Sequence, residues 1–380
     1  MAKKKITQLD LFSGIGGFHL GFEKAGFKVK SYFSEIDKHA IAVYKHQFKN
    51  AEYVGSVIDI DGNKLPRIDL ITFGSPCQDF SLAGKRKGME GERSSLVLEA
   101  IRLIDECRPS VFIWENVKGT FSSNNGADFA AILQAFANIG GYRLEWQLLN
   151  TSWVLPQNRE RVYLVGYSTK PGRNWRGVFP ITKSDRSDSE LECSRKAVTK
   201  CLTARGQEGH AGMQLIKVKS ATKAGYETAE EGDSINLSNP NSKTRRGRVG
   251  KGKAQTLDTG ANQAVVQPYQ NIEIGDIRYD EGGFRPRKNG IAPALVGSNN
   301  KSGTPNCSIL KDNTTYRIRR LTPIECERLQ GFPDNHTEYG IYDGEVKKMS
   351  NTQRYKQCGN AVTVDVVKAV AQQLIPIYNA

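Results

Sequence analysis

The chain has 380 residues, of which 38% are hydrophobic, so it can bury a sizeable core and is long enough for two domains or for one large domain with an insertion. Its 54 Lys and Arg residues exceed its 40 Asp and Glu residues, and the formal net charge of +14 favours a polyanionic partner. It contains no apolar run long enough to span a membrane and no apolar signal-peptide core after Met1, which predicts a cytoplasmic protein. Its seven cysteines form no CxxC pair and do not cluster with histidine, which argues against a disulfide framework and a metal site.

The first motif is a strand, a glycine-rich turn and a helix. The apolar run Ile6 to Phe12 predicts a strand, residues 13–17 (Ser-Gly-Ile-Gly-Gly) form the turn, and a helical pattern runs from Phe18 to Ala25. Such a unit lets a nucleotide approach the backbone closely at a helix N-terminus. The spacing differs from GxGxxG and therefore favours an adenosine-containing cofactor other than a dinucleotide. A turn that serves only tight packing is the alternative.

A second strand, Val29 to Phe33, precedes Glu35 and a helix from Lys38 to Phe48. An acidic residue roughly 20 positions beyond a glycine loop is placed to accept hydrogen bonds from ribose hydroxyls. The alternative is that Glu35 or Asp37 only caps the helix. A third short strand is expected from Tyr53 to Val57.

The stretch that follows the fourth strand presents a cysteine. The apolar run Ile68 to Phe73 predicts a buried strand, and Gly74-Ser75-Pro76 ends it just before Cys77. Open α/β sheets bind ligands at this edge, and a thiol on a stiff Pro turn suggests a nucleophile. A lone cysteine is otherwise most often a small buried hydrophobic residue. The basic, glycine-punctuated run 82–94 predicts a mobile loop that could close over a phosphate backbone.

A carboxylate and two arginines are expected at the same edge. Glu115 follows a strand from Ser110 to Trp114, where a buried carboxyl group could exchange a proton with a ring nitrogen. Arg159 and Arg161 are two apart in a strand-like segment, so they point to one face and offer planar forks to oxygen acceptors. Surface ion pairs are the alternative. Helices are predicted at 95–106 and 129–139, and a hairpin-like pair of strands at 142–150 and 161–167.

The character of the sequence changes at about residue 168. Up to about residue 317, short β-like pieces alternate with turns, and a basic run occupies 243–248, which predicts a separate, irregular, largely β module. Order returns with a capped helix within 319–333, which has Pro323 at its start and Gly331 at its stop. Residues 357–362 (Gln-Cys-Gly-Asn-Ala-Val) are expected to open a last helix running to about Ile375 and to return to the cofactor pocket.

Together these motifs make the chain resemble the DNA cytosine C5-methyltransferases of bacterial and phage modification systems. The shared motifs are Asp10-Leu11-Phe12-Ser13-Gly14-Ile15-Gly16-Gly17, Pro76-Cys77-Gln78, Glu115-Asn116-Val117, Gln157-Asn158-Arg159-Glu160-Arg161, the helix within 320–333 and Gly359-Asn360-Ala361-Val362. They occur in the family's order and cover nearly the whole chain apart from residues 168–315.

The resemblance implies a fold and a domain organisation. The fold class would be α/β, with a Rossmann-like sheet of the S-adenosylmethionine-dependent methyltransferases and a smaller, irregular, largely β target-recognition domain. Residues 1–167, completed by 357–380, would form the catalytic and cofactor-binding domain. Residues 168–317 would recognise the target, and residues 318–356 would form a hinge.

The resemblance also implies a reaction and the residues that carry it. The enzyme would transfer the methyl group of S-adenosylmethionine to carbon 5 of a cytosine flipped out of a specific duplex DNA sequence. Cys77 would attack C6 as a thiolate, Glu115 would engage N3, and Arg161 would contact the base carbonyl with Arg159 supporting it. Such a protein would be cytoplasmic and nucleoid-associated, a monomer without an obligatory protein partner, and free of a metal.

Binding residues are carried over by position. The cofactor would contact Phe12, Ser13, Gly14, Ile15, Gly16, Gly17, Glu35, Ile36, Val57, Pro76, Leu96, Asn360, Ala361 and Val362. DNA would contact Ser81, Lys85, Arg86, Arg93, Arg245, Arg246 and Arg248. Two positions depart from the family: Ser56 stands where an Asp often binds the adenine, and Ala361 stands where Ser is common.

Two other functions remain open at this point. A branch that resembles this family methylates tRNA with the same Cys and Glu motifs, although a basic variable module of nearly 150 residues fits duplex reading better. A relative that binds DNA without catalysis is the second alternative, and the intact Cys77, Glu115 and Arg161 argue against it.

Overall fold

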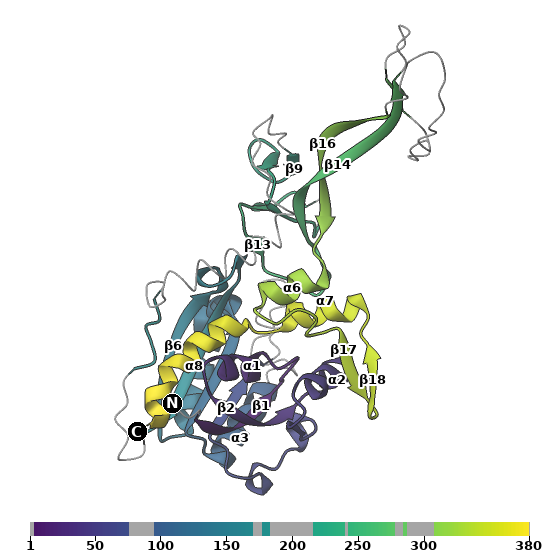
Figure 1. Cartoon of the computed structure of the whole chain (residues 1–380). Coiled ribbons are helices and arrows are strands. Elements are labelled where there is room, and N and C mark those ends of the chain that lie inside the picture. Colours follow the sequence, from purple (N-terminus) through teal and green to yellow (C-terminus); the bar gives the residue numbers. More distant parts are fainter. Residues whose placement is uncertain are drawn as a thin grey trace.

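The computed structural model describes residues 4–75, 95–169, 177–182, 216–239, 242–277, 284–286 and 308–379. Within these ranges the larger unit is a sheet covered by helices on both faces, and a smaller β unit extends away from it (Figure 1). No described helix is long and apolar enough to cross a membrane.

The centre of the larger unit is a seven-stranded sheet of order β3-β2-β1-β4-β5-β8-β6. Neighbours among the first five strands run parallel, and β8 is antiparallel to both β5 and β6. The strands are β1 Lys5–Leu11, β2 Lys28–Ser34, β3 Glu52–Tyr53, β4 Leu70–Phe73, β5 Val111–Val117, β6 Tyr142–Asn150 and β8 Glu160–Ser168. The expected α/β class is confirmed.

Alternation along the strands builds a core on each face of the sheet. In β5, Val111 and Ile113 belong to one buried cluster, whereas Phe112 and Trp114 belong to another. The first cluster includes residues of α1 and α8, and the second includes residues of α3 and α4. The five helices around the sheet are α1 Gly17–Lys24, α2 Lys38–Gln47, α3 Ser95–Cys107, α4 Ala127–Asn138 and α8 Val364–Asn379.

Three elements differ from the sequence prediction. β5 does not end at Trp114 but continues through Glu115 to Val117, because β8 pairs with it along this length. The third strand ends at Tyr53, and residues 57–59 form the 3-10 turn η1, because this segment is held by α3 rather than by a neighbouring strand. Residues 357–360 end α7 (Asn351–Asn360) instead of opening the last helix, and α8 begins only at Val364. The remaining short turns are η2 Gly62–Lys64, η5 Lys118–Gly126 and η6 Thr151–Trp153.

The capped helix predicted after residue 319 is confirmed as α6, Pro323–Leu329. Thr322 and Glu325 form a reciprocal capping box, Pro323 occupies the first turn, and Gly331 follows the helix with a φ of 79°. A hairpin of β17 (Tyr339–Tyr342) and β18 (Glu345–Lys348) lies between α6 and α7, and β17 packs beside α2.

The described part of 168–317 consists of strands and turns. A long antiparallel ribbon pairs β14 (Gln263–Ile277) with β16 (Ser308–Arg320) and extends away from the sheet unit in Figure 1. The other strands of this part are β9 Ile216–Lys219, β10 Tyr226–Ala229, β11 Ser234–Asn236, β12 Val249–Gly250, β13 Ala254–Gln255 and β15 Phe284–Pro286. One of them joins the two units, because β13 pairs in parallel with β7 (Gln157–Asn158).

A polar network is buried beneath the carboxyl edge of the sheet. Thr72 on β4 donates to Oδ1 of Asp10 at 2.7 Å, and the hydroxyl of Tyr44 on α2 lies 3.3 Å from Oδ2. Asp10 is completely buried in the strand interior. Burial raises the pKa of Asp10 to about 8, although the two hydrogen bonds oppose the shift. The folded protein therefore holds this carboxyl group protonated at neutral pH.

Replacing Asp10 with Asn tests this protonation. The pKa of Asp10 is raised in the folded state, so its contribution to stability is complete below the unfolded pKa near 4 and is lost as the pH rises through about 8. The Asp10→Asn variant lacks this titration, and its free energy of unfolding relative to wild type should rise by more than about 1 kcal/mol from pH 5 to pH 7.5. Urea denaturation at both pH values measures the difference. If the free energies of unfolding of the wild type and the variant changed equally with pH, the carboxyl group of Asp10 would ionise in the folded protein as it does in the unfolded chain.

Candidate active site

Several of the predicted site residues that the structure describes lie along one edge of the sheet. The strand register aligns Ser34, Leu11, Phe73 and Trp114 in one row across β2, β1, β4 and β5. The residues that directly follow this row are Glu35, Phe12, Gly74 and Glu115. Parallel strands present their carboxyl ends at the same edge, so the glycine loop, the acidic residue after β2 and Glu115 meet there.

Glu115 and Arg161 form an ion pair at this edge. The Arg161 Nε lies 3.2 Å from Glu115 Oε1, and their side chains are only 16% and 9% exposed. Oε1 is buried and has no hydrogen-bond partner of good geometry among the described residues. A Cβ built on Gly74 would lie 3.2 Å from Oε2, so the end of β4 runs directly beside the carboxylate. The carboxylate thus has an acceptor atom free for a further donor in a partly dehydrated place.

Arg159 is directed at the main chain of the C-terminal segment. Its Nη1 donates to Gly359 O at 3.2 Å and its Nη2 donates to Ala361 O at 2.9 Å, with the side chain buried. Burial, together with the charge of Arg161, lowers the pKa of Arg159 to about 9, so the guanidinium stays charged at neutral pH. Arg159 therefore joins the strand that carries Arg161 to residues 359–361.

The glycine loop is open on one side and held on the other. Phe12 and Gly14 have φ angles of 51° and 53°, and a Cβ on Gly14 would meet nothing within 4 Å. A non-glycine residue in the left-handed region costs on the order of 1 kcal/mol and is typical of ligand sites. Ser13 Oγ is buried without a hydrogen-bond partner. The loop therefore offers open backbone and an unsatisfied hydroxyl group, as a site for a polar ligand would.

Glu35 ties the end of β2 to this loop. Its Oε2 accepts the N–H of Gly14 at 2.9 Å, and its Oε1 accepts the N–H groups of Ile36 and Asp37 at 2.7 and 3.0 Å. Oε1 thus already accepts two hydrogen bonds, whereas Oε2 has a second lone pair that can accept another. Asp37 separately caps α2, as the alternative interpretation expected for that residue. Ile36 is 79% exposed beside the carboxylate, an apolar surface that a flat ring could cover.

The last motif returns to the first, as the sequence analysis expected. A Cβ on Gly17 would lie 2.6 Å from Val362 Cγ2, so only glycine permits this approach. Ala361 is buried and Asn360 is exposed. Val57 is buried in the core, and Leu96 packs against the same core cluster from the first turn of α3. Val57 and Leu96 thus flank the site from the α3 side of the sheet.

Two supports of the site were missed by the sequence analysis. His336 is buried and its Nε2 donates to Ile15 O at 2.9 Å, which braces the glycine loop from behind. Burial lowers the pKa of His336 to about 4, so the ring is neutral at pH 7. Arg102 on α3 donates to Val57 O and Ile60 O at 3.2 and 2.9 Å. A lone loop histidine carries no sequence signal, and Arg102 with Glu106 four residues on suggests only a surface ion pair.

The remaining predicted residues fall into two groups. Pro76, Cys77, Ser81, Lys85, Arg86 and Arg93 lie outside the described residues. Arg246 is exposed and Arg245 is half-buried, whereas Arg248 is buried and donates to the main-chain oxygens of Asn236, Ser238 and Asn239. Within the described ranges, no three His, Cys, Asp or Glu side chains are grouped to hold a metal ion.

The whole chain is similar to known methyltransferases. The profile of the C-5 cytosine-specific DNA methylase family matches residues 6–376. The orphan methyltransferase M.SPRI of Bacillus phage SPR is 31% identical over 98% of both chains. The type II methyltransferase M.Bsp6I of Bacillus sp. strain RFL6 is 29% identical over 96% of both chains.

Solved structures share the fold. The Entamoeba histolytica methyltransferase EhMeth superposes with a TM-score of 0.55 at 18% identity, over 98% of both chains. The S. pombe methyltransferase Dnmt2 superposes with a TM-score of 0.53 at 17% identity, over 98% of this chain and 99% of the other. At these identities the likeness concerns the architecture alone.

Replacing His336 tests whether it supports the glycine loop. The His336→Leu variant leaves the Ile15 carbonyl buried without a donor and should lower the free energy of unfolding by ~1–3 kcal/mol. The His336→Gln variant keeps a donor near the Nε2 position and should lose less. Urea denaturation at pH 7 compares both with His46→Leu, a control at a less buried histidine. Equal losses for Gln and Leu would show that ring packing, not the hydrogen bond, matters.

Proposed function

Because the chain belongs to the C-5 cytosine-specific DNA methylase family, we propose that it transfers the methyl group of S-adenosylmethionine to carbon 5 of a cytosine in a specific duplex DNA sequence. The family resemblance seen in the sequence is confirmed, and the chain is a cytosine C5-methyltransferase. The observation that carries the proposal is the buried Glu115–Arg161 pair, which lies beside the end of β4.

Cys77 is proposed as the nucleophile. It lies outside the described residues, two positions after Ser75, and two residues of chain span at most about 7 Å. The thiolate would add to C6 of the cytosine and form an S–C6 bond, which makes C5 electron-rich. C5 would then take the methyl group, leaving S-adenosylhomocysteine. A base or a water molecule would accept the C5 proton, the C5–H electron pair would restore the C5–C6 double bond, and the S–C6 bond would break to release the thiolate.

Glu115 and Arg161 would make this addition possible. Cytosine C6 is a weak electrophile, and a proton shared between Glu115 and N3 draws electrons out of the ring. Arg161 would donate to the base carbonyl oxygen and, in the absence of the base, already orients Glu115 through their ion pair. Arg159 would support the reaction indirectly, by holding residues 359 and 361 through hydrogen bonds. Glu115, Arg161 and Arg159 would thus each have a separate role.

The glycine loop fits S-adenosylmethionine. Ser13 Oγ is unsatisfied, the Gly14 backbone is open, Glu35 can accept hydroxyl groups, and the exposed Ile36 could cover an adenine ring. We therefore assign the cofactor to the loop 12–17, Glu35, Ile36, Val57, Pro76, Leu96 and the segment 360–362. When bound, it supplies an activated methyl group, and the protein supplies its orientation.

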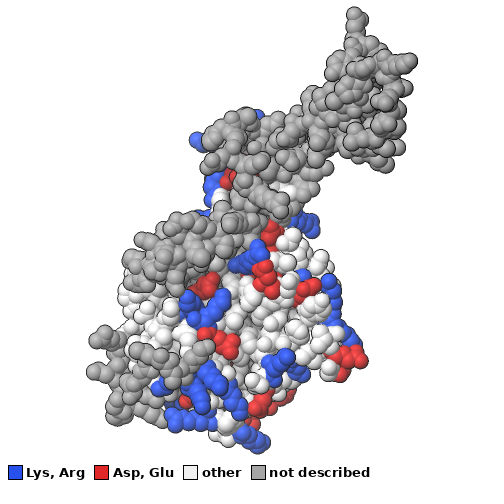
Figure 2. Space-filling view, viewed as in Figure 1, with Lys and Arg blue, Asp and Glu red and all other residues white. Residues whose placement is uncertain are grey.

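Duplex recognition is assigned to residues 168–317, with 318–356 as a hinge and 1–167 with 357–380 as the catalytic unit. The visible face of the sheet unit mixes Lys and Arg with Asp and Glu (Figure 2), so the net charge of +14 does not form a single patch on that face. Arg245 and Arg246 are proposed to contact DNA together with Ser81, Lys85, Arg86 and Arg93, and these contacts would offset the cost of flipping the base. Arg248 could join them only by leaving its three carbonyl partners.

A transfer assay tests the substrate. Purified protein with tritiated S-adenosylmethionine should label duplex DNA, and bisulfite sequencing of DNA from expressing cells should show protected cytosines within one recurring sequence. Transfer to tRNA and not to DNA would contradict the proposal and establish the RNA alternative.

A covalent trap tests the catalytic residues. A duplex with 5-fluorocytosine at the target, incubated with the wild type and S-adenosylmethionine, should form a denaturation-resistant adduct, because after methyl transfer the fluorine on C5 cannot leave as a proton does. The adduct should be absent for Cys77→Ser, and Glu115→Gln should slow methyl transfer by about 10²–10⁴-fold. Glu345→Gln, a change at an exposed carboxylate paired with Lys347, serves as the control and should retain activity. An adduct that survives in Cys77→Ser would refute the assignment.

A further inference from the structure

A short segment of the β module is built into the catalytic unit. Ala254 and Gln255 pair with Gln157 and Asn158, directly before Arg159. The Thr256 hydroxyl donates to Asn158 O at 2.7 Å. Ala254 and Leu257 are buried in the same core cluster as Leu329 and Cys358 of the last two motifs. Residues 254–257 therefore belong to the β module in sequence but pack with the catalytic unit.

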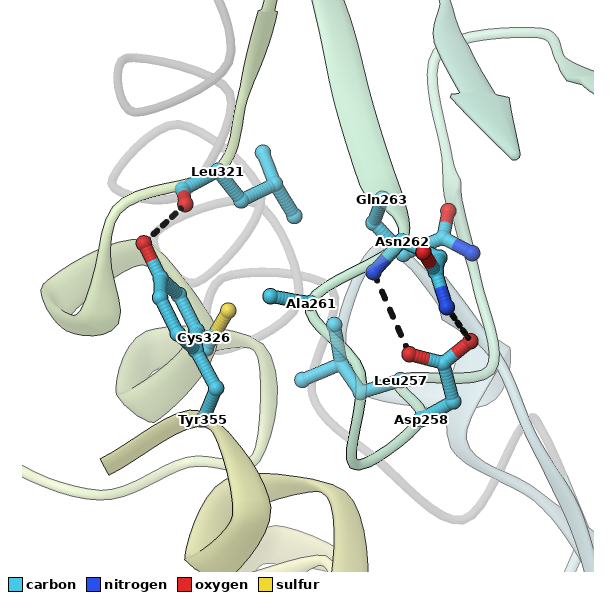
Figure 3. A pocket seen from close by; sticks show the side chains of 8 residues that line it. All are labelled: Leu257, Asp258, Ala261, Asn262, Gln263, Leu321, Cys326 and Tyr355. Carbon is cyan, nitrogen blue, oxygen red and sulfur yellow. Dashed lines mark hydrogen bonds between the residues drawn. The ribbon is translucent and has the colours of Figure 1, made fainter. Parts of the chain in front are cut away.

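The turn after this segment is organised by one carboxylate. Asp258 Oδ1 accepts the N–H groups of Gly260 and Asn262 at 3.1 and 3.2 Å, and Oδ2 accepts the Asn262 side-chain amide at 3.0 Å. Figure 3 shows Asp258 facing Asn262 at one end of a small pocket, with Leu257 and Ala261 pointing toward Cys326 and Tyr355. Because the carboxylate at the start of the turn accepts main-chain N–H groups from its middle and its end, Asp258 sets the backbone shape of the turn.

The backbone of this turn presses on Gly359. A Cβ on Gly359 would lie 2.7 Å from both C and O of Asp258 and 2.9 Å from N of Thr259, so the two main chains are in direct contact. The carbonyl of Gly359 is one of the two that hold Arg159. Three residues further on, Val362 packs against Gly17 of the glycine loop, beyond the second Arg159 acceptor at Ala361.

These contacts form a closed loop of three segments. The module segment binds the strand before Arg159, Arg159 binds residues 359 and 361, and residue 359 contacts the turn of the module segment. The far side of the turn is also anchored, since Leu321 N donates to Gln263 O at 2.9 Å and Tyr355 Oη donates to Leu321 O at 2.8 Å. A shift of the turn must therefore move the 359–361 segment or break the contact with it.

We propose that Asp258 is a positioning residue of the methyl-transfer reaction: its carboxylate shapes the turn 258–262, which fixes residues 359–361 and thereby Arg159 and the rear of the glycine loop. The proposal deepens the proposed function and rests on it for the reaction that is measured. It assigns to the β module a role in arranging the catalytic unit that is separate from reading the target sequence.

The effect of removing the carboxylate follows from this geometry. In Asp258→Ala the turn loses all three acceptor contacts, and a displacement near Gly359 should lower kcat about ten-fold, because small misplacements of catalytic groups cost up to about 10²-fold. The affinity for S-adenosylmethionine should fall several-fold. KM for DNA and the methylated sequence should stay unchanged, since no base-reading group is altered.

Asp258→Asn provides the conservative rescue. Its side-chain oxygen can still accept the two main-chain N–H groups, and the third contact is kept if the Asn262 amide turns its oxygen toward the new amide. Most of kcat should return. Glu231→Ala, a change at an exposed acid elsewhere in the module, is the control and should match the wild type. Asn262→Ala removes one contact and should give an intermediate loss of kcat. If Asp258→Ala does not fold, this variant tests the proposal in its place.

The test combines steady-state kinetics on duplex DNA, calorimetric titration with S-adenosylmethionine and hydrogen exchange of residues 357–362. The expected result is a lower kcat, weaker cofactor binding and faster exchange in Asp258→Ala, with rescue by Asn. Unchanged kcat and exchange would overturn the proposal, and so would a change confined to KM for DNA or to the methylated sequence. An inactive wild type would instead refute the proposed function, while the exchange of residues 357–362 would still decide the role of Asp258.

Discussion

The structure depends on the buried guanidinium of Arg159 and the two carbonyl groups that it holds. Arg159 lies between β7 and β8. Its acceptors, the carbonyl groups of Gly359 and Ala361, lie near the end of the chain, 200 and 202 residues later. A buried charge is tolerated only when it is hydrogen-bonded. These bonds therefore hold the C-terminal motif against the strand that carries Arg161, and through Val362 they reach the glycine loop.

The parallel strands of the sheet bring the other residues of the site together. Their register brings Phe12, Glu35, Gly74 and Glu115 to one edge of the sheet, although these residues are far apart in the sequence. Side chains on the surrounding helices and loops then hold the edge in shape, as His336 does for Ile15 and Arg102 for the segment after β3. The chemical groups lie at the sheet edge, and their supports come from segments scattered over the chain.

Two features of the structure could not be predicted from the sequence because the sequence patterns were ambiguous. The sequence has a helical pattern both before and after residues 357–360, so it does not show where one helix ends. In the structure α7 ends at Asn360, and Ala361 and Val362 pack against the glycine loop. Arg248 belongs to a basic run typical of a DNA-binding surface, yet its side chain is buried in contacts with three main-chain carbonyls. A charge run does not reveal which of its members point inward.

The sequence by itself determined the fold class and the family and predicted the chemical groups, because apolar runs followed by glycine, cysteine or acidic residues recur at strand ends whatever the rest of the chain does. It determined the capped helix at Pro323–Leu329 for the same local reason. Only the tertiary structure decided the pairing of Glu115 with Arg161, the hydrogen bonds of Arg159 to the C-terminal segment, the contact of His336 with Ile15 and the insertion of residues 254–262 beside Gly359. Each of these is a contact between segments far apart in the chain, and its geometry is set by packing rather than by local pattern.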